Sequence, residues 1–159
     1  MCSRVNKSDY YYGAFLSNLL DRGRTPVLVE KDSSRGVYKI LTGHTENYIY
    51  MKYVTTKDNG RLWNFGFSRD NLKEVEEYVK KDINLIFGLI CSYKGLIDTE
   101  IGVFSIEEFK KCIDFDCNKN KNHRISVLKQ PHSSYLTLYG TALDRDNGIE
   151  VDRYGINNL

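Results

Sequence analysis

The segment Tyr48-Ile49-Tyr50-Met51-Lys52-Tyr53 is followed by Asn59-Gly60 and then by Leu62-Trp63-Asn64-Phe65-Gly66-Phe67. Both longer segments are rich in aromatic and apolar residues, and the second alternates as a strand with two different faces does. Asn and Gly tolerate positive φ, so Asn59-Gly60 predicts a tight hairpin turn. The stretch therefore predicts two joined strands, with Lys52 projecting from the first strand into aromatic surroundings.

Two further extended runs precede this pair, over Pro26–Glu30 and Val37–Leu41, and turn residues separate them. Together the four runs predict an antiparallel meander. Helices are predicted on either side of it, over Asp9–Leu20 and Asp70–Lys81, because apolar residues recur there at helical spacing. Ser68 is placed to cap the second helix.

The second half of the chain continues with strands. Ile83–Cys91 is almost entirely apolar, which suits a strand covered on both faces and placed beside the meander after a helical crossover. Ser105-x-x-Glu108 has the capping-box pattern that opens a helix. Further strands are predicted over the segments Leu96–Phe104, Arg124–Lys129, Tyr135–Leu143 and Ile149–Tyr154, with Asn147-Gly148 turning between the last two.

These elements predict an α+β fold with a central mixed, largely antiparallel sheet, two or three flanking helices and a C-terminal β-hairpin. A chain of 159 residues fits a single domain, 1–159. Within it we expect a helix-meander-helix-strand core over 9–91, followed by strands and a short helix over 96–159.

Composition narrows the function classes only slightly. The net charge of +2 is too small to indicate a nucleic-acid-binding protein by itself, and twelve tyrosines suit sheet faces and cores as well as stacking surfaces. The first residues lack a continuous apolar stretch, so we expect no signal peptide, and no apolar run is long enough to cross a bilayer. We therefore expect a cytoplasmic protein whose four cysteines are reduced.

The order helix, three strands, helix, strand over 9–91, with Lys52 on the third strand, resembles the core of the restriction-endonuclease-like superfamily, the PD-(D/E)xK nucleases. In that family an acid on the second strand and an acid-x-lysine on the third bind magnesium. The resemblance implies that the metal polarises the phosphate and that the lysine stabilises developing negative charge.

The family's acidic ligands are missing here. Tyr50 stands two residues before Lys52 in place of the acid, and Val37-Tyr38-Lys39-Ile40 carries no carboxylate. The resemblance thus implies a degenerate, non-cleaving module that binds nucleic acid or a partner protein without a cofactor. Lys39, Lys52 and Arg61 are the residues expected to contact phosphates. A defence or mobile-element setting follows only by fold analogy.

Two other functions stay open. A magnesium-dependent nuclease or phosphodiesterase would use migrated carboxylates, Asp32 or Glu46, together with Lys52. A protein-interaction or inhibitor domain would use a tyrosine-rich face, since tyrosine is enriched at interfaces. The oligomeric state is not determined by the sequence.

Other patterns carry weaker signals. Cys112, Cys117 and His123 have a spacing at the edge of that of zinc sites, without a clear fourth ligand. The acids over Asp144–Asp152 depart from the calcium-loop pattern, and a hairpin explains them more simply. Basic residues around 119–129 fit a phosphate-contacting edge or a solvated loop.

Overall fold

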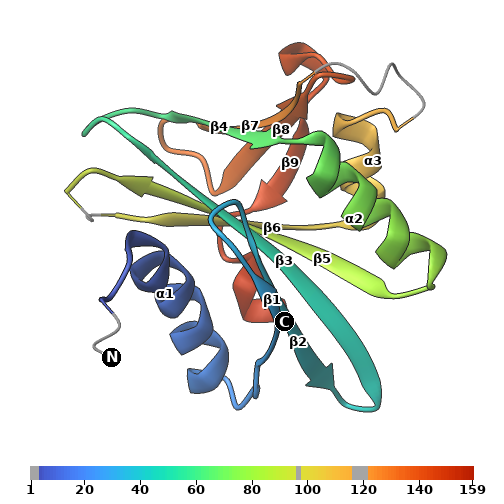
Figure 1. Ribbon diagram of the computed structural model, residues 1–159. Coiled ribbons are helices and arrows are strands. Elements are labelled where there is room, and N and C mark those ends of the chain that lie inside the picture. Colours follow the sequence, from blue (N-terminus) through green and yellow to red (C-terminus); the bar gives the residue numbers. More distant parts are fainter. Residues whose placement is uncertain (1–3, 96–97, 116–121) are drawn as a thin grey trace.

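The computed structural model describes residues 4–95, 98–115 and 122–159 (Figure 1). Its helices are α1 (Lys7–Asp21), α2 (Arg69–Lys80) and α3 (Ile106–Cys112). Its strands are β1 (Val27–Lys31), β2 (Gly36–Thr42), β3 (Thr45–Thr56), β4 (Leu62–Phe67), β5 (Asn84–Tyr93), β6 (Glu100–Ser105), β7 (His123–Lys129), β8 (Tyr135–Gly140) and β9 (Ile149–Asp152). Two 3-10 turns, η1 (Arg145–Asn147) and η2 (Gly155–Asn158), complete the order. The predicted α+β class is confirmed.

The strands form two sheets. The first has the order β1-β2-β3-β5-β6: β1, β2 and β3 are an antiparallel meander, and β5 joins β3 in parallel after the crossover through α2. The second has the order β4-β7-β8-β9 and is antiparallel throughout. The expected mixed sheet and the C-terminal hairpin β8–β9 are both present.

The prediction that a fourth strand extends the meander is wrong. Asn59 does adopt a positive φ of 68°, but β4 leaves the first sheet and pairs with β7. The reason is burial: Trp63, Phe65 and Phe67 point from β4 into the space between the two sheets, where they are almost fully buried. The edge of β3 that β4 would have occupied is instead taken by β5.

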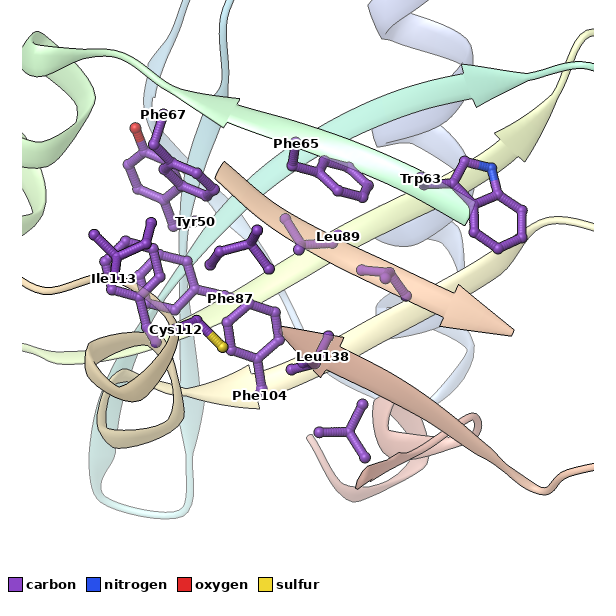
Figure 2. Packing of buried hydrophobic residues seen from close by; sticks show 14 of the residues in the cluster. Tyr50, Trp63, Phe65, Phe67, Phe87, Leu89, Phe104, Cys112, Ile113 and Leu138 are labelled. Atoms are coloured by element: carbon purple, nitrogen blue, oxygen red, sulfur yellow. The ribbon is translucent and has the colours of Figure 1, made fainter. Parts of the chain in front are cut away.

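The first sheet separates two apolar cores. Helix α1 covers one face of this sheet, whereas the second sheet, α2 and α3 cover the other (Figure 1). The alternation along β3 follows from this arrangement, because Ile49 and Met51 face α1 while Tyr48 and Tyr50 face the larger core. In that larger core Phe87 stacks on Phe109 with ring centroids 4.2 Å apart. Phe87 also stacks on Phe104 with ring centroids 5.3 Å apart (Figure 2).

The predicted caps at Ser68 and Ser105 are confirmed, whereas α1 begins earlier than expected, with Asn6 as its N-cap. Ser68 Oγ accepts a hydrogen bond from Asn71 N at 3.1 Å, and Ser105 Oγ accepts one from Glu108 N at 3.3 Å. These caps fix where α2 and α3 begin, and the first turn of α2 carries one of the site residues described below. None of the helices in the described ranges is long and apolar enough to cross a membrane.

Candidate functional site

Lys52 lies in the interior, with 7% of its surface exposed. Its Nζ donates hydrogen bonds to the Ser34 carbonyl oxygen at 2.8 Å and to Asn71 Oδ1 at 2.9 Å. It also lies 5.1 Å from the ring centroid of Phe67, so the predicted aromatic surroundings are confirmed. Burial lowers the pKa of Lys52 to about 8, because charge is disfavoured away from water.

Arg35 lies beside Lys52 and is enclosed by carboxylates. Its guanidinium, only 3% exposed, lies 2.6 Å from Glu74, 3.0 Å from Asp32 and 3.1 Å from Glu30. Burial opposes its charge, but the hydrogen bonds from Arg35 to Glu74 outweigh burial and raise the pKa of the guanidinium. We call Arg35, Glu30, Asp32 and Glu74 the arginine cage.

A tight turn between β1 and β2 positions this cage. Asp32 Oδ1 accepts hydrogen bonds from Ser34 N at 2.7 Å and from Arg35 N at 3.2 Å, the arrangement of an Asx turn. The turn directs the Arg35 side chain toward α2 and the Ser34 carbonyl toward Lys52. Asn71, in the first turn of α2, closes the connection by donating from Nδ2 to Ser34 Oγ at 3.3 Å.

Two buried polar atoms at this site, Arg35 Nη1 and Tyr50 Oη, make no hydrogen bond within the described structure. Arg35 Nη1 lies 3.0 Å from Asp32 Oδ2, which is an ion-pair distance, but the two groups are not oriented for a hydrogen bond. Burial also raises the pKa of Tyr50, which keeps its hydroxyl neutral. Unpaired buried groups are uncommon in folded proteins, because each costs about 1–3 kcal/mol.

The structure brings Asp32 close to Lys52 but leaves Glu46 far away. Glu46 lies six residues before Lys52 on the same strand, which corresponds to about 20 Å at the rise of a β-strand. There Glu46 lies 3.7 Å from Lys39, with which it forms an ion pair. Of the two alternative carboxylates, Asp32 therefore lies in the turn next to Lys52 and Glu46 does not.

The residues expected to contact phosphates are also separated. Lys39 lies across from Tyr48 near one end of β3, Lys52 is buried in its middle, and Arg61 follows its other end. The Lys52 ammonium is committed to two protein acceptors. These three cations do not form one phosphate-binding surface.

The weaker metal patterns receive no support from geometry. Cys112 is buried in the core, where burial raises the pKa of its thiol to about 11, and Cys117 lies outside the described residues. His123 Nδ1 lies 3.3 Å from Thr141 Oγ1. Across the described ranges no group of three or more His, Cys, Asp or Glu side chains is placed to hold a metal ion.

Helix α2 has two flanks of opposite charge, which sequence reasoning missed. Toward α3, the shallow grooves beside Phe115 are lined by Arg69, Lys73, Lys80 and Lys110 as cations and by Glu76 and Asp114 as anions. Toward β1, the corresponding groove is lined by the anions Glu30, Asp70, Glu74 and Glu77 and by the cations Lys73 and Lys81. We call these the basic and the acidic groove. Helical periodicity would have placed the residues of the two grooves on different sides of α2. It would not have shown which neighbouring element each side faces.

No protein-family model matches the chain, and no curated protein is significantly similar to it.

Proposed function

We propose that the chain is a binding module with a restriction-endonuclease-like frame that binds nucleic acid without cutting it. The order of its elements supports the frame: α1, the meander β1–β2–β3, the crossover α2 and then β5 parallel to β3. Fold likeness alone does not assign an activity. The proposal therefore depends on what occupies the position of the catalytic centre.

The arginine cage is the observation that carries the proposal. In a nuclease of this family, carboxylates beside the lysine bind a divalent metal. Here the carboxylates beside Lys52 surround a guanidinium that belongs to the chain itself. An arginine remains charged at all ordinary pH values and cannot activate water as a metal does. The cage thus supports a structural role for this centre, in place of hydrolysis.

The basic groove is the surface best suited to a phosphate backbone. Arg69, Lys73 and Lys80 form no ion pairs within the described ranges, and Arg69 and Lys80 are well exposed. Free cations along one side of a helix favour phosphates through charge and counterion release. The acidic groove would repel the same ligand, so the charge separation on α2 also gives the bound strand a defined side.

The test measures binding of labelled single-stranded and duplex DNA and RNA by fluorescence anisotropy over a series of salt concentrations. We expect Arg69→Gln/Lys80→Gln to weaken binding and to reduce the slope of log affinity against log salt by about 2. The matched control is Lys81→Gln/Lys94→Gln, which removes the same charge away from the basic groove. Equal effects of the two variants would refute this surface.

Cleavage is tested with the same probes and added magnesium or manganese. We expect intact probe after long incubation with the wild-type protein. Metal-dependent cleavage that disappears on Lys52→Met would instead establish the nuclease alternative.

A partner protein is the second candidate, and one observation favours it. Strand β1 is an edge of the first sheet, and its consecutive residues Val27, Leu28 and Val29 are between 41% and 55% exposed. An exposed apolar edge is a site for strand addition. Of the exposed tyrosines, Tyr10 lies on α1, apart from Tyr135 on β8 and Tyr154 just after β9.

Strand addition at β1 is tested by sedimentation velocity, because an edge that accepts foreign strands also pairs with a second copy at high concentration. We expect concentration-dependent association that Val29→Lys abolishes. Unchanged sedimentation of the wild-type protein at all concentrations would count against this candidate.

A further inference from the structure

A cleft of about 520 Å³ lies at the opposite end of β3 from Lys39. Its walls come from the β3–β4 connection, the end of β5, the β7–β8 turn and the residue after β9. The volume falls within the range of small-molecule sites. The cleft shares no residue with the arginine cage or the basic groove. We infer that it binds a small molecule carrying one phosphate or carboxylate group together with hydroxyl donors.

Three cations line this cleft, Arg61, Lys129 and Arg153, together with two carboxylates, Asp58 and Asp98. Glu100 lies buried behind them and forms ion pairs with two of the cations, Lys129 at 2.9 Å and Arg153. Burial of Glu100 is outweighed by hydrogen bonds from these partners, so the pKa of its carboxyl is lowered and it stays ionised. The charges therefore balance over the whole set but are separated within it, and the Lys129 and Arg153 side chains remain 25% and 24% exposed.

Arg61 lies beside Lys129, because its backbone carbonyl accepts a hydrogen bond from Lys129 N at 2.8 Å. Within the part of the chain that the structure describes, the Arg61 side chain forms no hydrogen bond or ion pair. Arg153, in contrast, already donates to Glu100 from Nε and Nη2 and to the Ser133 carbonyl from Nη1, which leaves at most one N–H on each Nη for a ligand. Arg61 is therefore the main donor for a phosphate or carboxylate, and its planar donors match both anions.

The remaining lining residues restrict the class of ligand. Asp58 and Asp98 also line the cleft, and both would repel a ligand that is anionic over its whole surface. They would accept hydrogen bonds from hydroxyl or amino groups of a ligand whose charge lies at one end. The Tyr93 ring, fixed edge-on against Trp63 at 5.3 Å, adds an aromatic wall. A sugar phosphate, a nucleoside monophosphate or a hydroxy acid has this combination of groups.

Three turns with left-handed backbone shape the rim of the cleft. Asn59, Asp98 and His132 all line it, and all have positive φ, with values of 68°, 56° and 57°. Asn, Asp and His are, after glycine, the residue types that adopt this conformation most readily. These residues therefore allow the chain to turn tightly around the cleft.

The test is isothermal titration calorimetry with three probes: AMP, glucose 6-phosphate and the hydroxy acid glycerate. We expect at least one of them to bind, and Arg61→Gln to weaken that binding about tenfold, the loss of one charged hydrogen bond of about 1.4 kcal/mol. Arg61 is exposed, so its replacement leaves the fold intact, which the thermal midpoint verifies. The phosphate probes and glycerate distinguish the two kinds of anion.

Arg69→Gln is the matched control, because it removes an exposed arginine from the basic groove and not from the cleft. Unchanged probe binding in this variant supports the cleft. Binding that is lost on Arg69→Gln and kept on Arg61→Gln would place the anion in the basic groove and overturn the inference. Failure of all three probes to bind would overturn it as well, while leaving nucleic-acid binding at the basic groove to its own test.

Discussion

Arg35 and Glu74 form a two-point ion pair across 39 residues of sequence, with Nε 3.1 Å from Oε1 and Nη2 2.6 Å from Oε2. The pair ties the β1–β2 turn to α2 on the face of the first sheet that also carries Lys52. Paired N–H donors on a carboxylate are among the stronger polar contacts in proteins. The contact therefore positions α2, and with it both of the helix's charged flanks.

Glu74→Gln tests how much this pair contributes to stability. The amide keeps the size of the side chain and one acceptor but removes the charge opposite a buried guanidinium. We expect the free energy of unfolding to fall by about 1–3 kcal/mol, less than for a fully isolated buried charge, since Asp32 and Glu30 remain. Urea denaturation measures it. The control is Glu77→Gln, an exposed neighbour in the acidic groove, and an equal loss there would show that the pair contributes nothing specific.

Arg35→Ala tests whether the guanidinium occupies the position of a metal. Without it, the carboxylates of Glu30, Asp32 and Glu74 face one another with only Lys52 nearby. We expect millimolar calcium or manganese to raise the thermal midpoint of the variant, by about 3 °C for each kcal/mol of binding energy. The same ions should leave the wild type unchanged.

The double variant Arg35→Ala/Glu74→Gln is the control for this experiment, and it should lose the metal response. A wild type that responds to the ions as strongly as Arg35→Ala would contradict the proposed replacement of metal by arginine.

Gly140→Ala tests the corner where β8 meets α3. A Cβ at this position would lie 2.5 Å from the Cys112 carbonyl oxygen and 2.7 Å from that of Arg124. Both are backbone atoms that already accept hydrogen bonds from Ala142 N and Thr141 N, so they cannot move freely. We expect a loss of about 1–3 kcal/mol in thermal or urea unfolding. Gly66→Ala is the control, because no described atom lies within 4 Å of the position that the new Cβ would take. This variant should change stability little.

The sequence predicted most elements because each was specified locally. Ser68 and Ser105 mark helix starts through contacts three residues away. The fourth strand was assigned to the wrong sheet because its partner, β7, lies about sixty residues further along the chain. The alternation of Trp63, Phe65 and Phe67 shows that one face is buried, but it does not show against which strands.

The candidate site was only half predictable for the same reason. Lys52 and Asp32 were identified from a family pattern, whereas Arg35 was not, because its meaning depends on Glu74 reaching it from α2. Sequence reasoning also treated Lys52 and Arg61 as one phosphate-contacting set. Burial decides that question, and the burial of Lys52 results from packing against Phe67 and Asn71, residues of two other elements.

Lys52→Met tests the burial of charge at this site through pH. The pKa of Lys52 is lowered to about 8 in the fold, against an ordinary value of about 10.4 in the unfolded chain. Between these values the unfolded chain binds more protons, so raising the pH stabilises the wild type. The loss of stability caused by burying the charged ammonium is fully present below about pH 8 and is gone above about pH 10.4. A methionine of similar length carries no such penalty at any pH.

We therefore expect the difference in unfolding free energy, wild type minus Lys52→Met, to increase by about 2–3 kcal/mol from about pH 7 to about pH 10. Taking the difference cancels the buried tyrosines, whose raised pKa values destabilise both proteins equally as the pH rises further. Urea denaturation at a series of pH values measures it. Lys39→Met should show no such increase, because that lysine is partly exposed and paired with Glu46. A flat difference for Lys52→Met would mean that water reaches the ammonium and that Lys52 is available to a ligand.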